Sequence, residues 1–287
     1  MKLLHDPVWL EAQYNNRALV PDHMQVLSRW AQASALARER SPVFLDEPYG
    51  DGPNETLDIF PAPPSAQPAP VLMFIHGGYW RTLDKADHSF VAPSFQADGA
   101  MVVVPNYALC PAVGIEQIVM QMTQVVAWVW HRAAQYGGDP TRIAVVGHSA
   151  GGHLASMLLS CRWKQVAEEL PAQPLSGAMS ISGLYDLEPL RHTPFLQADL
   201  KLTASSVARL SPAFFPRPKG SKLYAAVGLH ESEEFRRQNR LIREVWGPTA
   251  VPVCETVVNA DHFTVLNSLA DPKGRLHELA LRLLGLH

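Results

Sequence analysis

The hydrophobic residues of this chain gather in short, nearly uninterrupted runs, and most of these runs are followed by an amphipathic segment. Runs of this kind indicate strands that are buried on both faces, and spacings of three and four residues indicate helices. We expect strands within 42–48, 55–60, 71–78, 100–107, 142–149, 175–183, 222–231 and 251–262. We expect helices within 84–99, 114–138, 151–163, 233–246 and 272–286, with Pro93 breaking or kinking the first of these.

This alternation of strands and helices predicts an α/β fold, with a mostly parallel central sheet and helices on both of its faces. The first forty residues are expected to be helical, and their apolar positions are Met24, Leu27, Trp30, Ala31 and Leu36. The proline-rich segment 61–70 is expected to be an extended surface loop. We expect a single domain over 1–287, in which 1–40 and 184–216 form a small helical cap.

Composition limits the partners and the chemistry that we expect. The formal net charge is −3 with no run of basic residues, which argues against nucleic acid as a partner. We find no signal peptide and no long apolar run, so we expect a cytoplasmic protein that does not insert in a membrane. The cysteines, Cys110, Cys161 and Cys254, are widely spaced and are expected to be reduced thiols. No metal motif is present, so we expect no metal or other cofactor. The oligomeric state stays open, a homodimer included.

The strand within 142–149 leads into Gly147-His148-Ser149-Ala150-Gly151, a G-x-S-x-G pattern. Between a strand and a helix, this pattern places a serine hydroxyl on a sharp, strained turn. The following helix directs its positive end toward negative charge that develops nearby. We therefore interpret Ser149 as a nucleophile, with a plain turn containing serine as the alternative.

A serine nucleophile needs a base, which in this architecture is a histidine that follows the last strand. His262 stands at that position, whereas His153, His192 and His230 lie elsewhere along the chain. Asp261 is adjacent to His262 and is expected to form hydrogen bonds within its own loop.

The carboxylate that orients this base should follow an earlier strand. Glu231 comes three residues after Gly228 and is the main candidate. Asp186 stays open as an alternative. So do Glu233 and Glu234, although acidic residues are common in the first turn of a helix.

The segment His76-Gly77-Gly78-Tyr79-Trp80 follows the first buried strand. We expect the N–H groups of Gly78 and Tyr79, together with that of Ala150, to form an oxyanion hole. The walls of the substrate pocket are expected to include His76, Trp80, Leu184 and Tyr185. The cap aromatics Phe195, Phe214 and Phe215 either line this pocket or pack the cap onto the domain.

These motifs resemble the α/β-hydrolase superfamily. The segments "GHSAGGHL", "HGGYW" and "DHF" carry this resemblance, and "HGG" is similar to the hormone-sensitive-lipase-like esterases. "HGGYW" together with "GLHESEEFRRQ" resembles the kynurenine formamidase (arylformamidase) group, and "YNNRALVPDH" is similar to its bacterial relatives. The resemblance extends from about residue 56 to the end of the chain. The chain departs from that group in having a glutamate where aspartate is usual.

The resemblance implies hydrolysis of N-formylkynurenine by a serine triad, without a metal or cofactor. We therefore expect a serine hydrolase that acts on a small aromatic or apolar ester or formamide. A broad carboxylesterase for short acyl esters is the first alternative. A hydrolase fold kept as a non-catalytic binding module is the second.

Overall fold

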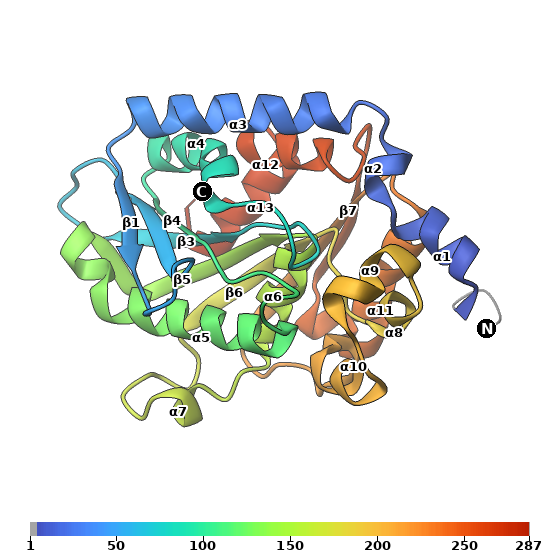
Figure 1. Cartoon of the computed structure of the whole chain (residues 1–287). Helices are drawn as coiled ribbons and strands as arrows, with labels where there is room; N and C mark the ends of the chain where they lie inside the picture. The colour runs from blue at the N-terminus through green and yellow to red at the C-terminus, as the bar shows by residue number, and fades with distance from the viewer. Residues whose placement is uncertain (1–4, 287) are drawn as a thin grey trace.

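A computed structural model describes residues 5–286, whose strands form one eight-stranded sheet (Figure 1). The strands occur in the order β1-β2-β4-β3-β5-β6-β7-β8. β2 is antiparallel to both β1 and β4, and all the other neighbouring strands are parallel. The bounds of the strands are Phe44–Pro48 for β1, Thr56–Phe60 for β2, Ala69–Ile75 for β3, Met101–Pro105 for β4, Gly138–His148 for β5, Leu175–Ile181 for β6, Lys222–Gly228 for β7 and Val253–Val257 for β8.

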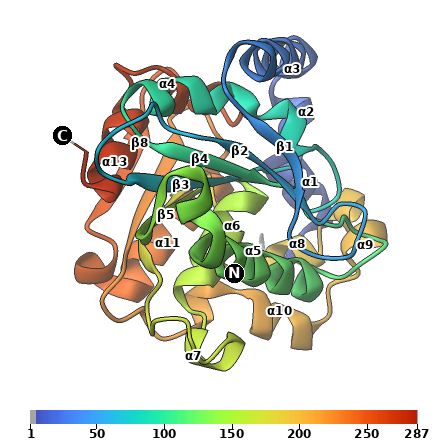
Figure 2. The same ribbon diagram turned by 90° about the vertical axis from the view of Figure 1, so that its left-hand side faces the viewer.

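Apolar side chains fill both faces of this sheet. Val71, Met73 and Ile75 of β3 belong to one buried cluster, and Leu72 and Phe74 belong to another, because successive side chains of a strand point to opposite faces. On one face lie α5, α6 and α11, and on the other lie α3, α4 and α13 (Figures 1 and 2). These helices span Ile115–Arg132 (α5), Ala150–Leu159 (α6), Glu233–Ala250 (α11), His23–Arg40 (α3), Ala92–Ala97 (α4) and Arg275–Leu284 (α13).

Several short helices gather on one side of the molecule, beyond the ends of the sheet strands (Figure 1). They are α1 (Pro7–Tyr14), α2 (Asn16–Leu19), α8 (Glu188–Arg191), α9 (Pro194–Leu200) and α10 (Ala204–Leu210). Two further short helices are α7 (Trp163–Val166) and α12 (Asn267–Ala270). Single 3-10 turns occur at Lys85–Asp87, Ser89–Val91, Ala133–Tyr136, Pro212–Phe214 and Thr264–Leu266.

The apolar runs predicted every strand, and the helices differ from their sequence pattern in two details. In α3, Met24 and Leu36 are 65% and 45% exposed. The buried stripe of this helix is Val26, Trp30, Ser34 and Ala37. It includes a serine because Ser34 Oγ accepts a hydrogen bond from the Phe90 N–H at 3.1 Å. Pro93 does not break a helix but lies in the first turn of α4, where a missing N–H costs nothing.

The proline-rich segment contains no helix or strand between residues 61 and 68, as expected for a loop. Within residues 5–286, no helix combines the length and the apolar character that crossing a membrane would require. The parallel strands all end at the same edge of the sheet, and the loops at that edge carry the predicted functional residues.

Candidate active site

Ser149 lies between the last residue of β5 and the first residue of α6. Its backbone has φ 56° and ψ −117°, a strained conformation for a residue with a side chain. The turn is held by a hydrogen bond from the Ser149 N–H to the Ile181 carbonyl at 2.8 Å. A Cβ at Gly147 would lie 2.0 Å from the carbonyl oxygen of Gly151, so this tight turn requires glycine. The local sequence therefore lifts the Ser149 hydroxyl above the edge of the sheet.

The structure brings Ser149, His262 and Glu231 together from three separate loops. Ser149 Oγ lies 3.0 Å from His262 Nε2, and His262 Nδ1 lies 2.7 Å from Glu231 Oε2. The other carboxylate oxygen, Oε1, accepts hydrogen bonds from the Ser182 hydroxyl at 2.5 Å and the Gly228 N–H at 2.7 Å. Both oxygens of Glu231 are thus occupied. The carboxylate is buried in an orientation that fixes the imidazole ring.

The other acidic candidates do not reach His262. Asp186 lies 3.7 Å from Arg237 and accepts a hydrogen bond from the Glu188 N–H. Glu234 forms hydrogen bonds with Arg237 and with the Tyr14 hydroxyl, and Glu233 is exposed on the first turn of α11.

The neighbouring Asp261 behaves differently from these three acids. Its Oδ1 accepts the N–H groups of Phe263 and Thr264 at 2.8 and 2.9 Å, as expected for hydrogen bonds within its own loop.

The loop after β3 has an unusual backbone, with φ values of 99° at Gly78 and 51° at Tyr79. A Cβ at Gly78 would lie 2.0 Å from the carbonyl oxygen of Thr82. The Tyr107 hydroxyl contacts the Gly77 carbonyl oxygen at 3.0 Å. Because the carbonyl and N–H groups of a trans peptide point in opposite directions, the Gly78 N–H faces away from Tyr107.

The N–H groups that we expected to form an oxyanion hole are uncommitted. Among residues 5–286, no protein acceptor binds those of Gly78, Tyr79 or Ala150. Gly78 and Tyr79 line the same cavity as Ser149, so their loop is close to the hydroxyl that would attack.

This cavity, of about 260 Å³, opens above Ser149 and His262. Its aromatic walls come from Trp30, Tyr79, Phe195 and Phe263. The rest of its lining consists of Leu27, Gly78 and Leu83 and of the polar residues Asn15, Asn16, Arg17, Arg81, Thr82 and His148.

Our four predicted pocket residues were wrong, since none of them lines this cavity. His76 is buried, stacked on Tyr107 and within hydrogen-bonding distance of Asn106. Trp80 has a positive φ of 57° and packs edge-on against His153 in the core. Leu184 and Tyr185 are fully buried, and the Tyr185 hydroxyl donates to Ser180 Oγ. Of the cap aromatics, Phe195 lines the cavity, whereas Phe214 and Phe215 do not.

Several residues of the cavity were missed by sequence reasoning, notably Asn15, Asn16 and Arg17. These three residues lie near the start of the chain, far from Ser149 in the sequence. Their local pattern does not show that they pack over this edge of the sheet. The available signal was the segment "YNNRALVPDH", which contains all three residues and is similar to bacterial relatives of the kynurenine formamidase group.

Two histidines near Ser149 are kept neutral by burial. Burial holds the pKa of His148 well below its ordinary value, and its Nε2–H donates to the His262 carbonyl at 2.8 Å. Burial also lowers the pKa of His153 to about 4, and its Nε2–H donates to the Leu210 carbonyl. Both side chains therefore act as neutral packing groups that position the loops around them.

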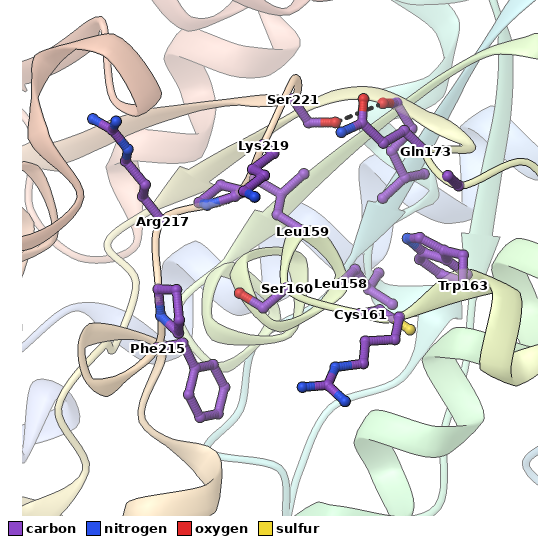
Figure 3. A pocket seen from close by; sticks show the side chains of 15 residues that line it. Leu158, Leu159, Ser160, Cys161, Trp163, Gln173, Phe215, Arg217, Lys219 and Ser221 are labelled. Carbon is purple, nitrogen blue, oxygen red and sulfur yellow. Dashed lines mark hydrogen bonds between the residues drawn. The ribbon is translucent and has the colours of Figure 1, made fainter.

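A larger cavity, of about 460 Å³, lies at the opposite end of α6 (Figure 3). Ser160 and Cys161 border it from the end of this helix, and Arg217 and Lys219 border it from the segment before β7. A ten-residue helix is about 15 Å long, so this cavity is remote from Ser149.

Three potential metal ligands, His5, Glu188 and His192, come within 4.8 Å of one another at the side of the molecule. Glu188 is already paired with Arg191, and none of the three lines the cavity above Ser149. This group is therefore separate from the candidate active site.

Comparisons with known proteins agree with this architecture. The family model BD-FAE matches residues 57–180. A kynurenine formamidase from Danio rerio is 32% identical over 255 residues, covering 87% of this chain and 84% of that protein. A kynurenine formamidase from Salmo salar is 30% identical over 274 residues, covering 93% of this chain and 90% of that protein.

Among solved structures, a candidate thioesterase from Silicibacter sp. TM1040 superposes with a TM-score of 0.81 at 28% identity. The superposition covers 96% of this chain and 98% of that one. An esterase from Pyrobaculum calidifontis shares the fold, with a TM-score of 0.67 at 17% identity.

The predicted fold and resemblance are therefore confirmed, as is the expectation of a hydrolase of the esterase or formamidase type. The chain belongs to the kynurenine formamidase family of α/β-hydrolases.

Proposed function

We propose that this protein is a serine hydrolase that cleaves small aryl formamides and related esters through an acyl-enzyme. The observation that carries this proposal is the hydrogen-bonded chain from Ser149 through His262 to Glu231 at the base of an open cavity. A buried carboxylate that orients a histidine, which in turn contacts a hydroxyl, is the arrangement that activates a serine.

The first half of the reaction forms the acyl-enzyme. His262 Nε2 accepts the Ser149 proton while Oγ bonds to the carbonyl carbon of the substrate. The carbonyl oxygen becomes an oxyanion and accepts hydrogen bonds from the N–H groups of Gly78, Tyr79 and Ala150. The tetrahedral intermediate then collapses, and the imidazolium protonates the departing amine or alkoxide.

The second half releases the acid. A water molecule gives a proton to His262 and attacks the acyl carbon, and the same N–H groups stabilise the second oxyanion. Collapse breaks the bond to Oγ, which takes back the proton from the imidazolium. Glu231 holds the imidazole in its tautomer and stabilises the imidazolium at each intermediate.

The lining of the cavity supports an aromatic substrate. Trp30, Tyr79, Phe195 and Phe263 surround the space above Ser149, and flat apolar walls favour a ring. A formyl group requires little room on the acyl side, which suits a cavity of about 260 Å³. Both formamidase relatives match this chain over most of their own lengths, which favours formamides over esters as the preferred class.

We assign the cap to segments 1–40 and 184–216, of which residues 1–4 lie outside the described part of the chain. In support, Asn16, Trp30 and Phe195 from these segments lie in the wall of the cavity. The oligomeric state stays open and is measured by sedimentation. The cytoplasmic location stays a prediction, which cell fractionation tests directly.

The test compares N-formylkynurenine with p-nitrophenyl acetate at matched enzyme concentration, together with labelling by a fluorophosphonate probe. We expect the probe to label Ser149, and the formamide to have the higher kcat/KM. A higher kcat/KM for the acetate would make the protein a broad carboxylesterase. Failure of the probe to label Ser149 would instead support a binding module.

A further inference from the structure

One wall of the active-site cavity is the junction between α1 and α2, where Asn16 and Arg17 line the same space as Ser149 and His262. This junction is held firmly. The Tyr79 hydroxyl donates to the Tyr14 carbonyl at 2.7 Å, and the buried Tyr14 hydroxyl donates to Glu234 Oε2 at 2.7 Å. The backbone of this wall is therefore tied both to the predicted oxyanion loop and to α11.

Asn16 is a buried amide without a protein partner. The residue is only 5% exposed, and its Nδ2 has no hydrogen-bond partner among residues 5–286. The neighbouring Asn15 is different, because its Nδ2 donates to Glu11 Oε1 and its Oδ1 accepts the Ala18 N–H. Buried polar side chains nearly always have a partner, so an unpaired amide in a cavity wall points to a ligand that supplies one.

Arg17 is the uncommitted cation of the cavity. Arg17 is exposed at the rim of the cavity, and its side chain forms no ion pair and no hydrogen bond with any residue in the described range 5–286. The other cation of the lining, Arg81, is occupied, because it pairs with Asp199, donates to the Phe195 carbonyl and lies over the Phe195 ring. The lining contains no carboxylate that could neutralise Arg17.

We propose that Asn16 and Arg17 form a carboxylate-binding subsite, which selects substrates that carry an anionic group on the far side of the aromatic ring from the scissile bond. A guanidinium matches a carboxylate with two parallel hydrogen bonds, and the Asn16 amide supplies a further donor. A single free cation suits a monoanion better than a phosphate. This inference rests on the proposed function, since it assumes that the scissile carbonyl lies at Ser149.

The test uses two acetate esters of equal shape, 3-(4-acetoxyphenyl)propanoate and its neutral amide, 3-(4-acetoxyphenyl)propanamide. We expect the wild type to prefer the carboxylate in kcat/KM, mainly through a lower KM. Arg17→Gln should lower the ratio of the two kcat/KM values by about tenfold, as expected for the loss of one charged hydrogen-bond pair. Asn16→Ala should lower the same ratio by a smaller factor, and Arg17→Lys should restore part of it.

Arg29→Gln is the matched control, because Arg29 is an exposed arginine of α3 that does not line the cavity. We expect it to leave the ratio unchanged. If the wild type hydrolyses both esters with equal kcat/KM, or if Arg17→Gln lowers kcat/KM equally for both esters, the proposal of a carboxylate subsite is wrong. The proposal of a serine hydrolase would be unaffected by that result. If Ser149→Ala cleaves both esters as fast as the wild type, the proposed function itself fails.

Discussion

Helix α6 has a cavity at each of its ends, and the smaller of the two is the candidate active site. The cavity at the N-terminal end, of about 260 Å³, contains Ser149 and His262. The cavity at the C-terminal end, of about 460 Å³, contains Ser160 and Cys161 (Figure 3). The volume of a cavity therefore does not identify where the chemistry takes place.

The two serines differ in their surroundings. Ser160 Oγ has no hydrogen-bond partner among residues 5–286, and no histidine or carboxylate lines its cavity. Burial raises the pKa of Cys161 to about 11, so its thiol stays protonated at neutral pH. The positive end of the dipole of α6 points to Ser149 and its negative end points to Ser160. The helix would therefore stabilise an oxyanion beside Ser149 but not beside Ser160.

The largest effect on kcat should appear when each of the two serines is replaced by alanine in a separate variant. Ser149→Ala removes the attacking oxygen, and we expect kcat for p-nitrophenyl acetate to fall on the order of 10⁶-fold. Ser160→Ala at the other end of the helix should leave kcat within about twofold, because Ser160 has no base. A comparable loss in both variants would mean that the helix as a whole, and not one end of it, supports activity.

The next effect concerns the acid that orients His262. Glu231→Gln keeps the size of the side chain but would favour the wrong imidazole tautomer, so we expect kcat to fall about 10⁴-fold. Asp186→Asn is the matched control, since Asp186 contacts Arg237 and not His262. Should the Asp186 variant lose activity as strongly as the Glu231 variant, the assignment of the acid would be wrong.

A third comparison separates backbone strain from catalysis. Gly78 and Gly99 both have positive φ, but a Cβ at Gly78 would meet Thr82 O at 2.0 Å, whereas a Cβ at Gly99 would meet nothing within 4 Å. Gly78→Ala should shift the loop and lower kcat about 10²- to 10³-fold, the usual effect of losing an oxyanion donor. Gly99→Ala should cost about 1 kcal/mol in the free energy of unfolding and leave kcat unchanged. Equal kcat in both variants would remove Gly78 from the oxyanion hole.

The sequence predicts some features of this structure, such as its strands and the positions of Ser149 and His262, better than others. The strands were predictable because burial on both faces demands apolar runs such as the one from Val71 to Ile75. The convergence of Ser149 with His262 was predictable because parallel strands end at one edge of the sheet. These features follow from local patterns and from a general rule of the fold.

The pocket was not predictable in the same way. Trp80 follows Tyr79 directly, yet the positive φ of both residues turns the indole into the core. Arg17 reaches the cavity only because the N-terminal helices cross the edge of the sheet, and that packing involves contacts between distant segments. The direction of a side chain in an irregular loop depends on backbone angles that a single sequence does not reveal.

The last prediction concerns stability rather than rate, and it depends on His153, which lies one turn from Ser149. Burial lowers the pKa of His153 to about 4, below the ordinary value of about 6.5 in the unfolded chain. The unfolded state therefore binds the proton first, so the stability from this group is complete above pH 6.5 and is lost as the pH falls toward 4.

At pH 5 this loss amounts to about 2 kcal/mol in the free energy of unfolding. Urea denaturation at pH 7 and pH 5 measures it directly. His153→Gln, although less stable at pH 7, should show a smaller difference between the two pH values than the wild type. The exposed His230→Gln should show the same difference as the wild type. An unchanged pH dependence in the His153 variant would mean that the folded protein binds a proton at His153 without losing stability, so that burial of this histidine does not cause the loss at pH 5.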